Sequence, residues 1–321
     1  MECMLRLAGT RVWHPFASWL VLCGTAATSF AQSGSMGELG ARLAPAYAQM
    51  QNLTLVPDLS TAHYRVDDGS GRMHVDVTRL GYETPVADLG QGSALLARLT
   101  AGHLRMTTDL PVAVSGPGNV ATQWSAYGIS GGVAGRFELG HGVTVVPALD
   151  AGLTRLANQS DYSGSGVLLQ PFLDGPIFNW NSDAWVLTPH LGIDWVPDTP
   201  GRRIAVHAHT AWSRVATYGE SDRARRFTET AGVYSVRAEH AMPTTLRLFE
   251  RQVEWALFGG HSGFLGPGRS TLGFSSVAEV GIGLQVPLSS KSEASKRLRV
   301  GFSYLFGTHV RGWTVSMGLP Y

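Results

Sequence analysis

The sequence predicts an all-β fold, an antiparallel transmembrane β-barrel of about twelve strands preceded by a short N-terminal helical segment. The first observation is that large apolar residues alternate with small or polar ones over segments of roughly ten residues, as in a strand with two different faces. The second is composition, because 44% of the residues are hydrophobic and only 15% are charged. The third is that no run of 18 apolar residues follows residue 31, so no membrane-spanning helix is predicted.

The N-terminus predicts export from the cytoplasm. Arg6 and Arg11 precede an apolar stretch at residues 16–27, and small residues then lead to Ala31. This order is typical of a secretory signal peptide, which we place at residues 1–31. The alternative is a membrane-anchoring helix, but the apolar stretch is too short to cross a hydrocarbon layer of roughly 30 Å.

The mature chain is expected to be one barrel with a short leader. Cys3 and Cys23 are the two cysteines of the chain, and both lie in the signal peptide, which excludes disulfides and thiolate metal sites after cleavage. We expect a linker or plug segment at residues 32–52 and an outer-membrane barrel at residues 53–321. We predict neither a metal site nor a cofactor.

Residues 36–50 show the near-helical spacing of the leader. Large side chains recur at Leu39, Leu43, Tyr47 and Met50, and Pro45 interrupts the pattern. The segment could sit in the barrel lumen or form an arm outside it, and the sequence leaves both positions open.

Twelve strands follow from the alternation. In the stretch from residue 298 to residue 306, Leu298, Val300, Phe302, Tyr304 and Phe306 share one face. The predicted strands are residues 58–66, 72–82, 94–106, 122–139, 143–157, 183–197, 203–217, 229–240, 250–258, 272–288, 297–307 and 310–321. Two of them carry a proline in mid-strand, Pro147 and Pro189, which predicts a bulge or kink at each.

Charges and aromatic residues decide which solvent the apolar face meets. A secreted β-sandwich would direct the apolar face into a protein core, whereas a barrel directs it at lipid. Aromatic residues gather toward strand ends, at Trp185, Trp195, Trp313 and Tyr321. This placement suits the interfacial girdles of a membrane barrel, and short and long connections also alternate along the chain as in bacterial barrels.

Several segments together resemble the β-domain of autotransporters. They are "GRFELGHGVTVVPALDAGL", "TPHLGIDW", "RVGFSYLFG" and "GWTVSMGLPY", and they fall within residues 120–321. The closest similarity is to solitary, passenger-less autotransporter barrels of Gram-negative bacteria, because only a short segment separates Ala31 from the first strand. The resemblance implies a twelve-stranded barrel in the bacterial outer membrane, inserted by the barrel assembly machinery.

The same resemblance implies an assembly signal in the last strand. Its members are Trp313, Val315, Met317, Leu319 and Tyr321, which alternate on one face and end on an aromatic residue. Pro320 in the penultimate position departs from the family pattern.

The opposite face of the strands is predicted to line a narrow polar lumen. The inward charged residues are Arg136, Glu138, Asp150, His190, Asp194, His207, His209, Glu279 and Arg299. A solvated network that braces the wall is the simpler interpretation. The sharper one places His190 nearly opposite His209, with Asp194 diagonal to His207, as a group that binds a divalent metal or senses pH.

Two functions are compatible with the sequence. The first is a non-enzymatic barrel that forms a narrow or plugged pore, or a structural element of the outer membrane. The alternative is a lipid acyl-hydrolase or rim protease, for which His261 and Ser262 are the loop candidates. Arg223, Arg225 and Arg226 could contact lipopolysaccharide phosphates.

The prediction of an outer-membrane barrel also indicates which partners to expect. Outer-membrane lipid and lipopolysaccharide are the expected partners of the folded chain. The net charge of +1 argues against nucleic acid as a partner. A monomer is the expected state.

Overall fold

A computed structural model describes residues 36–55, 61–67, 72–197, 203–219, 226–248, 251–287 and 297–318. The predicted signal peptide, most of the arginine-rich loop and the last three residues, including Leu319 and Tyr321, lie outside these ranges.

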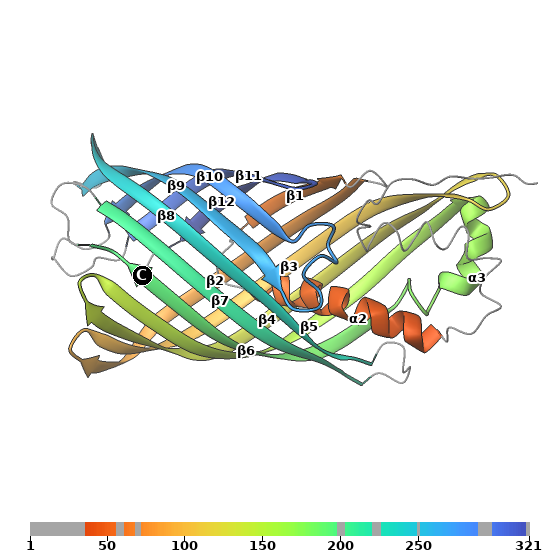
Figure 1. Ribbon diagram of the computed structural model, residues 1–321, viewed down its shortest axis with the longest axis horizontal. Coiled ribbons are helices and arrows are strands. Elements are labelled where there is room, and N and C mark those ends of the chain that lie inside the picture. Colours follow the sequence, from red (N-terminus) through yellow and green to blue (C-terminus); the bar gives the residue numbers. More distant parts are fainter. Residues whose placement is uncertain are drawn as a thin grey trace, which may run out of the picture.

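Twelve antiparallel strands close into one barrel, which confirms the predicted fold class (Figure 1). The strands are β1 (Thr61–Asp67), β2 (Arg72–Gly90), β3 (Ser93–Ala113), β4 (Pro117–Gly140), β5 (Val143–Gly164), β6 (Asn181–Trp195), β7 (Arg203–Tyr218), β8 (Thr228–Leu248), β9 (Arg251–Leu265), β10 (Ser276–Pro287), β11 (Arg297–Gly307) and β12 (Val310–Gly318). Each strand pairs with its neighbours in sequence, and β1 pairs with β12 to close the wall. Closure leaves no open sheet edge, as a membrane-spanning sheet requires.

The two ends of the barrel differ. At one end, called the turn end here, the connections include the tight turns between β2 and β3 and between β4 and β5. At the other, called the loop end, lie residues 165–180, Gly219, residues 226–227 and residues 266–275, with the short helices η1 (Ser165–Leu169) and α3 (Gln170–Leu173). Figure 1 shows α3 at the loop end, near the far ends of the longest strands.

Side chains alternate between lipid and lumen as the sequence predicted for the fold. Along β11, Val300, Phe302 and Tyr304 are about half exposed, whereas Ser303 and Leu305 are buried. The outward face is apolar because lipid, not water, covers it.

β2 and β3 are longer than predicted. The prediction ended one strand at residue 82 and began the next at residue 94, but the ladder continues to Gly90 and Ser93. Pro85 explains the early end predicted for β2, because proline normally marks a strand end, and here the chain absorbs it as a bulge between Pro85 and Ala87. The added length of β3 lies at its other end, after residue 106.

The two mid-strand prolines interrupt the sheet locally. Pro147 has no partner in β4, where pairing jumps from Ala148 to Val145, and Pro189 has none in β7, where it jumps from His190 to Leu187. Proline has no N–H to donate, so each ladder loses its hydrogen bonds at that point. Because β5 still pairs with β6 at both prolines, the wall stays continuous.

The helix α2 (Met36–Leu53) precedes the barrel and contacts β3, β4, β5, β7 and β8. It lies toward the loop end, and its C-terminus reaches into the middle of the barrel (Figure 1). Among the described residues, no helix is both long enough and apolar enough to cross a bilayer.

Candidate functional site in the barrel lumen

The lumen is the candidate functional site because α2 and most of the buried charges meet there. Every residue from Ala46 to Leu55 is buried. Five of these buried side chains carry polar groups, namely Tyr47, Gln49, Gln51, Asn52 and Thr54. A helix that is buried on all sides cannot lie on a surface, so this segment sits inside the strand wall.

An aromatic cluster holds the helix toward the loop end. The ring of Tyr47 lies 5.1 Å from Trp124, 5.0 Å from Trp180 and 6.2 Å from Phe227, measured between ring centroids. The Trp180 ring meets Tyr47 and Trp124 edge to face. Such tilted contacts add attraction to the burial of large apolar surfaces.

Polar side chains fix the C-terminal turn of α2 to the wall. Thr154 on β5 donates a hydrogen bond to Gln51 at 2.8 Å. Ser213 on β7 donates one to Asn52 at 2.5 Å, and its own oxygen lies 2.8 Å from Thr188. Because each bond joins a specific pair, the helix has one preferred rotation in the lumen.

Two glycines make room for the chain that leaves the helix. A Cβ at Gly102 would lie 2.0 Å from the carbonyl oxygen of Thr54, and a Cβ at Gly128 would lie 2.3 Å from its hydroxyl. Only glycine allows such close approach of the wall to the helix end.

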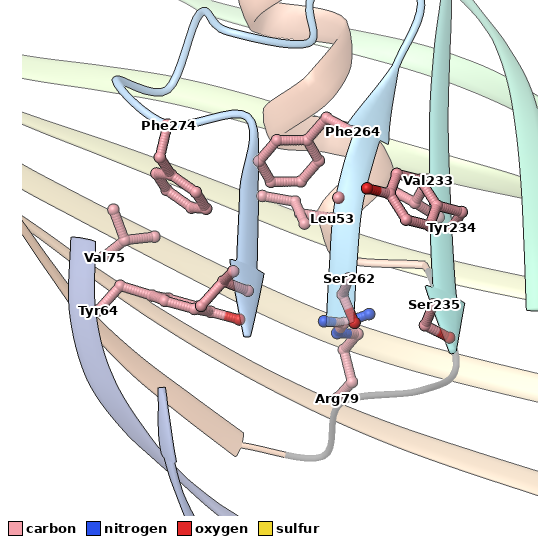
Figure 2. A pocket seen from close by; sticks show the side chains of 12 residues that line it. Leu53, Tyr64, Val75, Arg79, Val233, Tyr234, Ser235, Ser262, Phe264 and Phe274 are labelled. Carbon is pink, nitrogen blue, oxygen red and sulfur yellow. The ribbon is translucent and has the colours of Figure 1, made fainter. Parts of the chain in front are cut away.

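A small cavity of about 50 Å³ remains beside the helix end. Figure 2 shows Tyr64, Val75 and Phe274 on one side of it, and Arg79 near Ser262 at its lower edge. Ligand pockets usually measure about 300–1,000 Å³, so this cavity is too small for a metabolite.

A first charge cluster crosses β2 to β7 on the lumen side. Arg98 contacts Glu83 at 2.9 Å and Asp150 at 3.4 Å, and Asp150 contacts His190 Nε2 at 2.8 Å. His190 Nδ1 lies 3.2 Å from His209 Nε2. All of these side chains lie on the lumen face, and both Asp150 and His190 are almost completely buried.

A glycine on the strand between Arg98 and Asp150 allows the first charge cluster to form. Gly132 on β4 pairs with Arg98 on one side and with Asp150 on the other. A Cβ at Gly132 would lie 2.0 Å from Asp150 Oδ1, so the arginine reaches the carboxylate across a position without a side chain.

A second charge cluster repeats this arrangement on β8 to β11. Gly260 separates Arg237 from Glu279, whose side chains approach to 3.6 Å. Arg299 forms an ion pair with Glu239. The guanidinium groups of Arg237 and Arg299 both lie against the ring of Phe258, at 3.7 and 4.7 Å from its centroid, and are attracted to its π-face.

The histidine group differs in register from the prediction. His190 pairs directly with Ala211 and lies diagonal to His209, whereas Asp194 lies directly opposite His207. The His207 Nδ1 to Asp194 Oδ1 distance is 2.6 Å. Within the described part of the chain, no group of three or more His, Cys, Asp or Glu side chains has a geometry that could hold a metal ion.

Arg136 and Glu138 stand apart from both clusters, near the turn end. Arg136 is partly buried and Glu138 is exposed. The carboxylate of Glu138 lies over Gly92 of the neighbouring turn, where a Cβ would meet it at 2.3 Å.

Four members of the clusters were missed in the sequence. Glu83 was missed because the predicted strand ended at residue 82, whereas Arg98, Arg237 and Glu239 lie in predicted strands with weak alternation. A pattern that could have identified these residues is an arginine, a glycine and an acid at paired positions on three successive strands. This pattern can be recognised only when the register of the strands is known.

His261 and Ser262 lie on opposite faces of β9. Ser262 lines the cavity on the lumen side, whereas His261 is exposed and lies 3.3 Å from the hydroxyl of Tyr234. Successive side chains on a strand point to opposite faces, so this serine and histidine cannot form a catalytic pair.

Comparison with known proteins agrees with the fold. Residues 67–318 match the family model described as "Solitary outer membrane autotransporter beta-barrel domain". The chain belongs to this family. No curated protein matches this solitary autotransporter barrel.

Two solved structures are similar in fold to the solitary autotransporter barrel. The β-domain of the Bordetella autotransporter BrkA is 13% identical, with a TM-score of 0.47, over 79% of this chain and 93% of that chain. The translocator domain of the autotransporter NalP from Neisseria meningitidis is 14% identical, with a TM-score of 0.46, over 94% of this chain and 99% of that chain.

Proposed function

We propose that this solitary autotransporter barrel is a closed, non-enzymatic outer-membrane protein whose lumen is plugged by α2. The observation that carries the proposal is the burial of every residue from Ala46 to Leu55 inside the wall. A twelve-stranded barrel is wider than the eight-stranded ones that side chains alone can fill, so a helix is needed to close it.

The specific contacts of α2 support a resident plug. Its aromatic contacts, its hydrogen bonds to Thr154 and Ser213, and the glycines facing Thr54 all fit one position of the helix. We infer that the two charge clusters brace the wall on which the helix rests. Their charges are paired across strands, as a network that stabilises a narrow barrel requires.

The last strand fits the proposed role in assembly. Trp313, Val315 and Met317 are 43%, 41% and 69% exposed on the outward face of β12. We infer that this apolar face is what the barrel assembly machinery contacts, with outer-membrane lipid taking its place afterwards.

Single-channel recording in planar bilayers tests the plug. We expect the chain from residue 32 onward to be electrically silent and the same chain without residues 32–55 to show steady conductance, because the deletion removes the buried helix. A full conductance in the longer chain would contradict the proposal.

A control separates plugging from misfolding. Both proteins should migrate as folded barrels in unheated gels, and a chain shortened only by residues 32–35 should stay silent. If the deletion variant folds and remains silent, the wall itself is closed and α2 is not the plug.

A further inference from the structure

An unusual set of basic side chains lies on the outward face where β12 meets β1. The register places neighbouring outward residues in two rows across β11, β12, β1, β2 and β3. The row nearer the loop end is Phe306, Arg311, Arg65, His74 and Thr107. The next row is Tyr304, Trp313, His63, Asp76 and Arg105. We call Arg65, Arg311, Arg105, His63 and His74 the basic seam face.

The two central arginines face each other without an acid between them. Arg65 and Arg311 are direct cross-strand partners, and both are exposed. Like charges at directly opposed positions destabilise a sheet. Within the described ranges, neither guanidinium forms an ion pair or hydrogen bond. An anion between the two guanidinium groups would remove this repulsion.

The surrounding side chains are already held in place. His63 Nδ1 lies 2.5 Å from Asp76, and the His63 ring stacks on Trp313 at 5.7 Å between centroids. Arg105 donates two hydrogen bonds to Gln123, at 3.0 and 2.6 Å. The one carboxylate in these rows is therefore engaged by a histidine, and the three arginines give the face a positive balance.

An apolar surface continues from the basic seam face toward the turn end. Phe302, Val315 and Met317 are 53%, 41% and 69% exposed there. The face thus presents guanidinium groups beside a strip of lipid-facing apolar side chains. This is the arrangement that fits a membrane lipid with phosphates at its head and acyl chains below.

We propose that the basic seam face binds the phosphorylated lipid A portion of lipopolysaccharide. Bacterial barrels keep short turns on the periplasmic side, which places the loop end and this face at the outer leaflet. Arg65 and Arg311 hold one phosphate between them, Arg105 approaches from the side, and acyl chains lie along Phe302, Val315 and Met317. Guanidinium suits this role because it binds phosphate oxygens in a bidentate manner.

Binding of purified lipid A to the refolded chain in detergent, followed by native mass spectrometry, tests the site. We expect the double variant R65Q/R311Q to bind lipid A about tenfold more weakly, since charge-assisted hydrogen bonds to phosphate are lost. The matched control is Arg214→Gln, which removes an exposed arginine from β7 and should leave binding unchanged. Unchanged binding in R65Q/R311Q, or an equal loss in R214Q, would overturn the site.

Two further measurements identify the lipid and exclude misfolding. Native protein should bind lipid A more tightly than phosphatidylglycerol, and equal binding would show that any anionic lipid suffices and reject lipid A as the occupant. Without lipid, R65Q/R311Q should resist urea at least as well as the parent, because a repulsion has been removed. Lipid A should then raise the urea midpoint of the parent and leave that of the variant unchanged.

Discussion

Single glycines decide how the lumen of this barrel is filled. Gly132 and Gly260 each separate an arginine from an acid on the next strand but one, and Gly102 receives the backbone that follows α2. In each case the missing side chain provides the space through which two other groups meet. The chain therefore uses glycine here for close approach between neighbours and not for turning the backbone.

Substituting Gly102 should displace the helix end and leave the wall folded. In Gly102→Ala, the new methyl would lie 2.0 Å from the Thr54 carbonyl oxygen, which is backbone and cannot rotate away. We expect measurable conductance in planar bilayers from this variant, with the folded-barrel gel mobility retained.

Gly81→Ala is its matched control, because no atom lies within 4 Å of a Cβ there. That variant should be as silent as the parent. Silence in both variants would mean that α2 tolerates a shift of its C-terminal end without opening a path.

The buried and exposed aspartates should differ in their effect on stability. Asp150→Asn removes a charge that contacts Arg98 and His190 deep in the lumen, and we expect unfolding free energy to fall by about 1–3 kcal/mol. Asp183→Asn removes a charge that lies 3.9 Å from Arg155 on the outward face, with 39% of the side chain exposed. Exposed pairs contribute roughly 0–1 kcal/mol, so this variant should be close to neutral.

Urea unfolding followed by tryptophan fluorescence measures both variants. Equal losses would show that the first charge cluster is as weakly coupled to folding as a surface pair, which would remove the support for a braced wall.

At the scale of strands and helix, the sequence was informative about faces and less so about register. Alternation along a strand depends only on the period of two, so the apolar outward face could be predicted from the letters alone. Register depends on turn geometry, which the letters between these two strands did not specify. His190 was therefore expected nearly opposite His209, whereas it pairs with Ala211 and lies diagonal to His209. The extension of β2 beyond Pro85 escaped prediction because a bulge depends on neighbouring strands.

The placement of α2 needed the fold as well. Residues 36–50 predicted a helix with a proline, and their composition suited both a lumen and an arm outside the barrel. What separates these positions is the set of wall residues that receive the helix, such as Trp124, Thr154 and Ser213, and they come from strands far away in the sequence.

Over the whole molecule, the wall is unequal around its circumference. The ladder between β3 and β4 runs from Ala94 to Ala113, whereas the ladder between β1 and β12 runs only from Thr61 to Val66. Fewer hydrogen bonds join the first and last strands than join any of the long central ones.

Hydrogen exchange should report this inequality. Backbone amides of residues 61–66 and 310–315 are expected to exchange faster than those of residues 94–106 in β3, because a short ladder opens at a lower free energy. Mass spectrometry of peptic fragments from the refolded barrel measures the difference. Equal protection would show that the barrel opens only as a whole.

The short ladder between β1 and β12 also has a consequence for how the cylinder is completed. Residues 61–66 and 310–315 are the most distant partners in the chain, so their meeting carries the largest entropic cost of any strand pair. The joining of these two strands therefore gains little from their own short ladder and brings Arg65 and Arg311 together at the junction. If lipid A binds across Arg65 and Arg311, a membrane lipid links β1 to β12. The closed barrel would then be most stable in the one leaflet that contains that lipid.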